Sequence, residues 1–179
     1  MKNLLIKLKL IDYLNTEIKI SKSEFLRKLN LLVDEGSTNS LTDIFEVFSS
    51  SKNEYKGKVD FSKFEIKRKR KFFDINFNFP LAKGTVNQKG ELLYINTEIN
   101  AFKGLIVFFF IILLIFYSIF LITLIFGSIN EGKESLIIIP FILIHGSLMM
   151  GIPYLFLRKS VERFKYNFER ELFYLTKET

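Results

Sequence analysis

Two long apolar segments dominate the hydrophobic pattern of this chain. Residues 104–126 contain no charged side chain over 23 positions, and residues 136–157 contain only His145 among Lys, Arg, His, Asp and Glu over 22 positions. An α-helix rises about 1.5 Å per residue, so about 20 apolar residues cross a hydrocarbon core of about 30 Å. Because only nine residues join the two segments, the pattern predicts a transmembrane helical hairpin.

The first 50 residues change period more than once. Over residues 4–10, an apolar residue stands at every second position from Leu4 to Leu10, with Leu5, Lys7 and Lys9 between them. This pattern predicts a half-buried strand, although an amphipathic helix fits so short a segment as well. Residues 17–20 are typical of another short extended piece. The sequence from Ser21 to Glu24 fits a capping box, in which the serine hydroxyl accepts from a free helix N–H group and the Glu24 side chain reaches back to the cap. Apolar residues then follow at helical spacing and predict a helix over residues 23–34.

A second amphipathic helix is predicted behind Ser40, over residues 41–48, after a loop at residues 35–40. From residue 55 onward the apolar period becomes two, which is typical of strands with one buried face. The predicted strands are residues 55–60, 63–70, 72–79, 85–88 and 92–100. Turns are predicted at residues 79–80, at Gly84 and at residues 89–90. The predicted fold class is α+β, with N-terminal helices and an antiparallel meander of four or five strands before the hairpin.

The last segment returns to helical spacing. Val161, Phe164, Phe168, Leu172 and Leu175 form one apolar stripe. We expect this helix to continue directly from the second apolar segment and to pack its stripe on the sheet. A helix lying on the bilayer surface would use the same stripe. Three parts are therefore predicted: a domain over residues 1–103, the hairpin over residues 104–157, and an amphipathic helix over residues 158–179.

Charge predicts the orientation of the hairpin. Residues 1–103 carry 19 Lys and Arg against 13 Asp and Glu, and residues 158–179 carry 6 against 4. Lys103, Arg158 and Lys159 flank the apolar segments, and cytoplasmic flanks are enriched in such residues. We therefore expect both termini in the cytoplasm. The Lys-, Asn-, Ile- and Phe-rich usage suggests an AT-rich bacterial genome, and hence the bacterial inner membrane. Lys7 and Lys9 interrupt the first apolar stretch, so no signal-peptide core is predicted.

The absence of cysteine excludes disulfides and thiol chemistry. One histidine, no glycine-rich phosphate loop and no cluster of metal-ligand spacing argue against an enzyme, a metal site or a bound cofactor. We therefore expect a non-enzymatic protein, although carboxylates that pair only in the folded chain leave no pattern in the sequence.

The run Lys67-Arg-Lys-Arg-Lys71 is the most concentrated charge in the chain. If Phe64 and Ile66 face the core, Arg68 and Arg70 continue on that face, while Lys67, Lys69 and Lys71 point to the other. Three interpretations remain open: a solvated strand end, contact with anionic lipid, or a ligand site in which arginine binds a phosphate or carboxylate. Duplex nucleic-acid recognition lacks an identifiable reading helix.

His145 lies near the middle of the second apolar segment, where an ionisable group marks a candidate functional position. The alternative is a neutral imidazole that bonds the neighbouring helix. Gly146, Ser147 and Gly151 follow, and the spacing of Ser147 and Gly151 lets helices approach closely. The first segment has few small or polar residues. We therefore expect it to face lipid, and the second to face protein or a pore.

Three short motifs carry a resemblance to a known group. Tyr55-Lys-Gly57, Phe64-Glu-Ile66-Lys-Arg68 and Pro80-Leu-Ala-Lys-Gly84 resemble those of a family of small uncharacterised bacterial membrane proteins with a β-rich cytoplasmic domain before a two-helix hairpin. The predicted third strand departs from the Tyr-Arg-Asn pattern usual there. The resemblance implies this architecture and a C-terminal amphipathic helix, and it implies no activity.

These patterns together predict a homo-oligomeric membrane protein, because a single hairpin encloses nothing. Its basic domain would bind an acidic, nucleotide-like ligand or a partner protein, and its output would be a channel or a loss of membrane integrity. A role in antiphage defence follows by analogy alone. The competing hypotheses are a non-conducting membrane adaptor and a lipid-binding module in which the sheet closes over an acyl chain.

Overall fold

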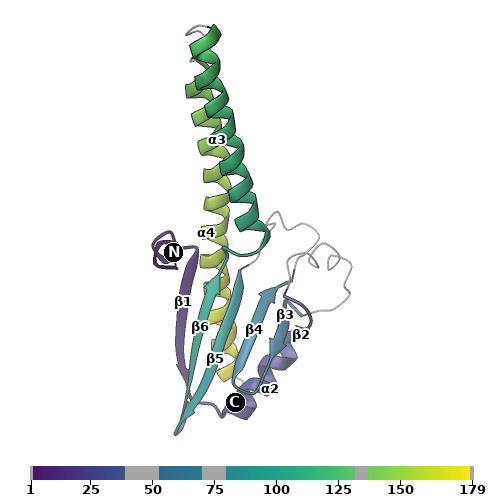
Figure 1. The fold of residues 1–179 in the computed structure, drawn as a ribbon. Helices are drawn as coiled ribbons and strands as arrows, with labels where there is room; N and C mark the ends of the chain where they lie inside the picture. Colours follow the sequence, from purple (N-terminus) through teal and green to yellow (C-terminus); the bar gives the residue numbers. More distant parts are fainter. Residues whose placement is uncertain (1, 39–52, 70–79, 132–136, 178–179) are drawn as a thin grey trace. The chain divides into compact units, whose positions relative to one another are not determined.

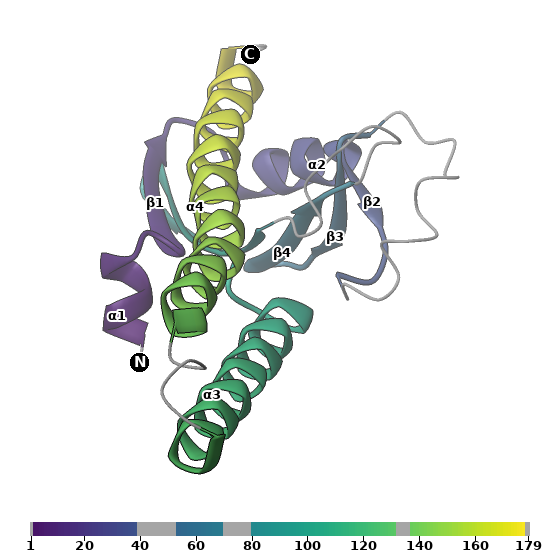
Figure 2. The ribbon, with the colours of Figure 1, turned by 90° about the horizontal axis from the view of Figure 1, so that it is seen from above.

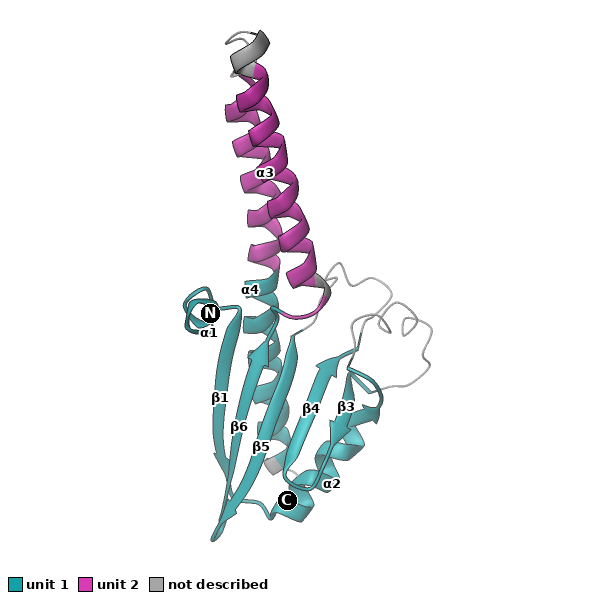
Figure 3. Ribbon diagram, viewed as in Figure 1, with its two compact units in different colours: residues 1–102, 157–179 teal, residues 103–156 magenta. Residues whose placement is uncertain are grey.

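The chain divides into two compact units. A computed structural model describes residues 2–38, 53–69, 80–131 and 137–177. Residues 1–102 and 157–179 form one unit, called the sheet unit below, and residues 103–156 form the other, called the hairpin unit (Figure 3). The C-terminal helix therefore belongs to the same unit as the N-terminal domain.

The order of elements mixes helices and strands, as the α+β prediction requires. The elements are α1 (Lys2–Lys7), β1 (Ile11–Ile18), α2 (Lys22–Leu32), β2 (Val33–Glu35), β3 (Tyr55–Val59), β4 (Lys63–Arg68), β5 (Leu81–Lys89), β6 (Leu92–Asn100), α3 (Leu105–Glu131) and α4 (Ile139–Lys177) (Figure 1). The predicted helix over residues 41–48 and the predicted strand over residues 72–79 lie outside the described residues.

The sheet has more strands than the sequence predicts. Within the described part of the chain, six strands pair in the order β1-β6-β5-β4-β3-β2. β1 pairs antiparallel with β6, with Leu14 opposite Thr97, and β2 pairs parallel with β3, with Val33 opposite Tyr55. The prediction of a purely antiparallel meander of four or five strands is therefore wrong. Pairing between segments so far apart in the chain leaves no local sequence signal.

The predicted strand at residues 4–10 is also wrong, because α1 occupies Lys2–Lys7 and β1 begins only at Ile11. The alternative of an amphipathic helix describes this segment better. The predicted extended piece at residues 17–20 is the end of β1, which finishes at Ile18.

The capping prediction for α2 is confirmed at its first residue. Ser21 is the N-cap, and its hydroxyl accepts from the backbone N–H of Glu24 at 3.3 Å. The carboxylate of Glu24 instead pairs with Lys28, at 3.3 Å. The helix ends at Leu32, and Val33 enters β2 because it is β-branched and its side chain is buried.

The turn predicted at Gly84 is wrong. Gly84 lies inside β5, opposite Phe64 of β4. A Cβ atom there would lie 2.0 Å from Cζ of the Phe64 ring. The glycine therefore makes room for an aromatic ring on the neighbouring strand. The turn predicted at residues 89–90 is confirmed, with Gly90 at φ 60° between β5 and β6.

One face of the sheet carries the core. α2 and the C-terminal part of α4 cover it (Figure 2). The Lys28 ammonium of α2 donates to the Leu175 carbonyl of α4 at 2.9 Å. Phe168 of α4 is 1% exposed and lies 5.8 Å from the Phe64 ring. The whole predicted stripe of α4 is buried: Val161, Phe164, Phe168, Leu172 and Leu175. The prediction that this helix packs on the sheet is confirmed.

The hairpin unit consists of α3 and the first part of α4. Two helices are long and apolar enough to cross a membrane, by length and composition: Ile106–Gly127 (22 residues) and Ile139–Leu175 (37 residues). α4 runs without interruption from Ile139 to Lys177, with Pro153 inside it. The prediction of one long helix that leaves the second apolar segment and continues into the C-terminal stripe is confirmed.

Candidate functional site

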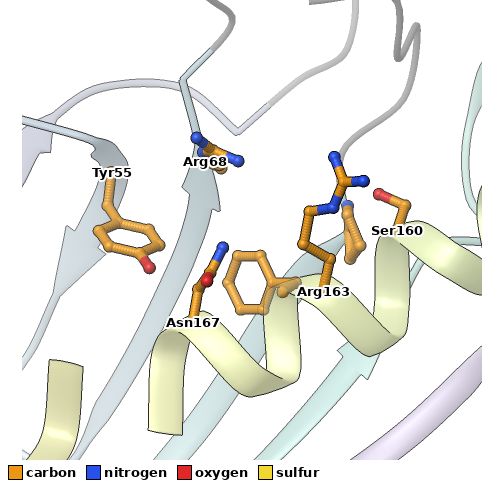
Figure 4. A pocket seen from close by; sticks show the side chains of 7 residues that line it. Tyr55, Arg68, Ser160, Arg163 and Asn167 are labelled. Carbon is orange, nitrogen blue, oxygen red and sulfur yellow. The ribbon is translucent and has the colours of Figure 1, made fainter. Parts of the chain in front are cut away.

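A small cavity lies between the sheet and α4 in the sheet unit, and we call it the arginine notch. It is lined by Tyr55, Arg68, Pro80, Ser160, Arg163, Phe164 and Asn167 (Figure 4). Its volume of about 10 Å³ is close to the space for one water molecule. The notch is therefore large enough for one oxygen of an anion, with the rest of the anion outside.

The strands and α4 contribute opposite walls of the notch. Tyr55 and Arg68 face each other in the β3–β4 register, so both side chains leave the same face of the sheet. Ser160, Arg163 and Asn167 follow one another at three- and four-residue intervals, which places them along one face of α4. Phe164 fixes the spacing of the two walls, because its ring packs edge-on against Tyr55 at 5.9 Å.

The polar groups of the notch are cationic or neutral. None of the described lining residues carries a carboxylate, although the pKa of Tyr55 is raised by its burial and, in smaller part, by the nearby Glu171 and Glu54. The Nε atom of Arg68 is buried and has no hydrogen-bond partner among the described residues, which is costly for a charged group. Burial raises the pKa of Tyr55 to about 12, and its hydroxyl, like that of an ordinary tyrosine, is protonated and able to donate near neutral pH. These features favour an anion with several acceptor oxygens, such as phosphate.

The predicted alternation of faces along β4 is confirmed for the described residues. Arg68 lines the notch on the face of Phe64 and Ile66, whereas Lys67 belongs to the opposite face. Lys67 is 2% exposed, and Lys56 opposite it is 3% exposed. Lys67 therefore does not line the notch, and its assignment to the same site as Arg68 has no geometric support.

The remaining residues of the basic run do not join the notch either. The Lys69 ammonium pairs with the Asp34 carboxylate, and it is not among the lining residues. Arg70 and Lys71 lie outside the described residues. The second arginine of the notch is instead Arg163, which lies 95 positions after Arg68 and which the sequence patterns did not identify. Its only sequence signal is its spacing from Ser160 and Asn167 beside the apolar stripe.

The hairpin unit contains a polar pair between its two helices. The Tyr117 hydroxyl of α3 and Nδ1 of His145 of α4 are 2.5 Å apart. Gly146 makes room for this pair, because a Cβ atom there would lie 3.3 Å from the Tyr117 ring. The interpretation of His145 as an imidazole bonded to the neighbouring helix is therefore favoured by the geometry. The sequence patterns did not identify Tyr117, although it is the one tyrosine of the first apolar segment.

The other candidate residues of the second segment lie away from this contact. Ser147 is exposed, and a Cβ atom at Gly151 would have no described atom within 4 Å. An open hollow of about 340 Å³ adjoins the polar pair, lined by Phe116, Tyr117, Phe120, Phe141, Ile142 and His145. Thus Gly146 packs within the hairpin, whereas Ser147 and Gly151 remain available to another molecule.

The described residues contain no group of three or more His, Cys, Asp and Glu side chains able to hold a metal ion. Comparison with known proteins finds no matching family model, no similar curated protein and no similar solved structure. The family resemblance drawn from the motifs is therefore not confirmed. What the structure establishes is an α+β sheet unit with an arginine-lined notch, joined to two apolar helices compatible with membrane spans.

Proposed function

We propose that this chain is a non-enzymatic membrane protein that binds an acidic, phosphate-bearing ligand in the arginine notch. The ligand would be nucleotide-like, and binding would alter a self-assembled hairpin that forms a channel or disrupts the membrane. The observation that carries the proposal is the pair Arg68 and Arg163 around one small cavity, whose described lining residues include no carboxylate.

The unpartnered Arg68 Nε supports an anionic ligand. A buried Nε atom without an acceptor among the described residues carries a desolvation cost that a bound anion would relieve. Arg163 is exposed and would approach the same anion from α4. Two guanidinium groups on different elements suit a phosphate group better than a carboxylate, because phosphate offers more acceptor oxygens at wider angles.

The proposed coupling uses α4 itself. Ser160, Arg163 and Asn167 are on the helix that also supplies the second apolar segment. An anion shared by Arg68 and Arg163 would strengthen the attachment of α4 to the sheet. Because α4 is continuous, a change in its packing near Arg163 would be transmitted along the helix toward His145.

Self-assembly is supported by the polar groups that the hairpin does not use internally. Nδ1 of His145 is paired with Tyr117, and the described residues offer no partner for Nε2. The His145 side chain is exposed, as is Ser147. Exposing such groups to lipid is costly, whereas contact with another hairpin or with a water-filled path satisfies them.

Ligand binding tests the first half of the proposal. Isothermal titration of the full chain in detergent with inorganic phosphate, pyrophosphate and a cyclic dinucleotide should give binding to at least one of them. Arg68→Ala should weaken that binding by roughly 10- to 100-fold, the loss typical of a hydrogen bond to a charged group. Arg27→Ala is the matched control, since it removes an exposed arginine of α2 outside the notch. Equal losses in both variants would contradict a specific site.

Conductance tests the second half. Full chain reconstituted in planar bilayers should pass ions in response to the ligand identified by titration. His145→Leu should change the conductance, because it removes the polar group at the proposed path. Ligand binding without any conductance would favour the non-conducting adaptor instead. Cross-linking that finds only monomers, both in mild detergent and in lipid, would remove self-assembly.

The lipid-binding alternative finds less support in the sheet unit. The core face of the sheet is occupied by side chains of α2 and α4, including Phe25, Leu29, Phe168 and Leu172. An acyl chain would have to displace several of them. Native mass spectrometry after delipidation tests this alternative, because a core lipid would persist as a bound mass.

A further inference from the structure

The short N-terminal helix α1 and the residue after it expose three large apolar side chains. Leu4 is 58% exposed, Ile6 37% and Leu8, just after the helix, 36%. No residue of α1 is buried. The core of the sheet unit starts only at Leu10 and Ile11, each 3% exposed. The helix therefore does not contribute its side chains to the core of its own unit.

The end of α1 is nevertheless well defined. The N–H of Leu10 donates to the Leu5 carbonyl, and the N–H of Lys9 donates to the Ile6 carbonyl, both at 2.9 Å. This is the double hydrogen bond of a Schellman motif, in which the residue in the position of Lys9 takes a left-handed conformation. Lys9 has φ 55°. Glycine is the residue that fits this conformation without strain, so lysine is present at an energetic cost.

The charged side chains within residues 2–10 are all lysines. Lys2 pairs with Glu98 at 2.7 Å, which attaches the start of α1 to β6. Lys7 and Lys9 are exposed and form no ion pair within the described part of the chain. Exposed leucine and isoleucine bordered by lysine are the composition of segments that lie in the interface of an anionic bilayer.

The chain connection limits how far the end of α1 can lie from the first residue of α3. The N–H of Ala101 donates to the Leu10 carbonyl at 3.0 Å, so the end of α1 is fixed to the end of β6. α3 begins at Leu105, four residues after Ala101. Four residues of extended chain span at most about 14 Å. A bilayer entered at the start of α3 therefore lies within reach of α1.

We propose that α1 and Lys9 dock on the surface of an anionic phospholipid bilayer. Leu4, Ile6 and Leu8 enter the headgroup region, and Lys7 and Lys9 contact lipid phosphates. This inference rests on the membrane insertion of the hairpin proposed above. The strained lysine at the end of α1 is explained, because its charge serves the membrane surface rather than the fold.

Spin labelling of the full chain in lipid nanodiscs tests the inference. The chain has no cysteine, so Leu4→Cys accepts a single nitroxide, whose collisions with oxygen and with a water-soluble nickel chelate report its depth. We expect the label to be protected from the chelate when the bilayer contains phosphatidylglycerol, and less so in phosphatidylcholine alone. A label at Leu31→Cys, 66% exposed on α2, is the aqueous control, and one at Ile115→Cys reports insertion of the hairpin.

Variants separate the charge of the lysines from the folding of α1. Lys7→Gln and Lys9→Gln should each lower the ratio of membrane-bound to aqueous label at Leu4 by about fivefold, the effect of one lysine near an anionic surface. Lys9→Gly should give the same loss while relieving the left-handed strain, so that a loss cannot be attributed to unfolding. A Leu4 label that stays aqueous while the Ile115 label is in lipid overturns this inference alone. Aqueous labels at both positions overturn the membrane function as well.

Discussion

Replacing Gly84 by alanine distinguishes the structure from the turn that the local sequence suggests. In a turn with open surroundings, alanine would be tolerated or slightly stabilising, because it restricts the unfolded chain. In β5, the new Cβ atom would lie 2.0, 2.3 and 2.7 Å from three atoms of the Phe64 ring. Phe64 is 2% exposed and its ring packs against Phe168 at 5.8 Å, so the ring has little room to withdraw.

The magnitude follows from two opposing effects. Overpacking of a close-packed core costs about 1–3 kcal/mol, and the loss of freedom in the unfolded chain returns about 0.4–1 kcal/mol. Gly84→Ala should therefore lower the free energy of unfolding by about 1–2 kcal/mol. For a unit of this size, the midpoint of thermal unfolding should fall by about 4–8 °C.

Far-ultraviolet circular dichroism of the full chain in detergent measures this midpoint. Gly36→Ala is the matched control, because a Cβ atom at Gly36 meets no atom within 4 Å, and its midpoint should change by less than about 2 °C. Phe64→Leu in the Gly84→Ala background should recover part of the loss, since the smaller side chain vacates the contact. An unchanged midpoint in Gly84→Ala, or no recovery in the double variant, would refute the proposed packing of β4 against β5.

Three further predictions concern the sheet core, the notch and the hairpin. Phe168→Ala should lower the free energy of unfolding by about 3–5 kcal/mol, because it leaves a cavity in the core. Trypsin should then cleave α4 faster than in the unsubstituted chain. An unchanged rate of cleavage would contradict the packing of α4 on the sheet. Because burial raises the pKa of Tyr55 to about 12, the unfolded state loses this proton near pH 10 and the folded state does not. The contribution of Tyr55 to the free energy of unfolding should therefore be fully present below pH 10 and be lost, by about 2–3 kcal/mol, between pH 10 and 12. In thermal melts across this pH range, Tyr55→Phe should lose less stability than the unsubstituted chain. Tyr117→Phe should reduce the stability of the hairpin in detergent by about 0.5–2 kcal/mol, and no further loss should appear when His145→Gln is added, because one hydrogen bond is removed only once.

Much of the local structure could be predicted from the sequence. The strand over residues 92–100 has the predicted boundaries, and the hydroxyl of Ser21 caps α2 as expected. These features depend on neighbours within a few residues, whose spacing the sequence records directly. Of the candidate site, Arg68 was found because the period of a strand places it on the same face as Ile66.

The rest depends on segments that meet only in the folded chain. β1 is the edge strand beside β6, and Arg163 lines the same notch as Arg68, although a long stretch of chain separates the two members of each pair. Gly84 and Tyr117 also acquire their meaning from the ring or the imidazole opposite them.

The sequence by itself determined which faces are apolar, which segments are long enough to cross a membrane and where α2 begins. The tertiary structure decided which of these faces meet, and therefore that the cationic notch combines β4 with α4. The physical reason is that burial favours contact between apolar faces without specifying their partners. The choice of partner depends on shape, register and chain connection over the whole unit.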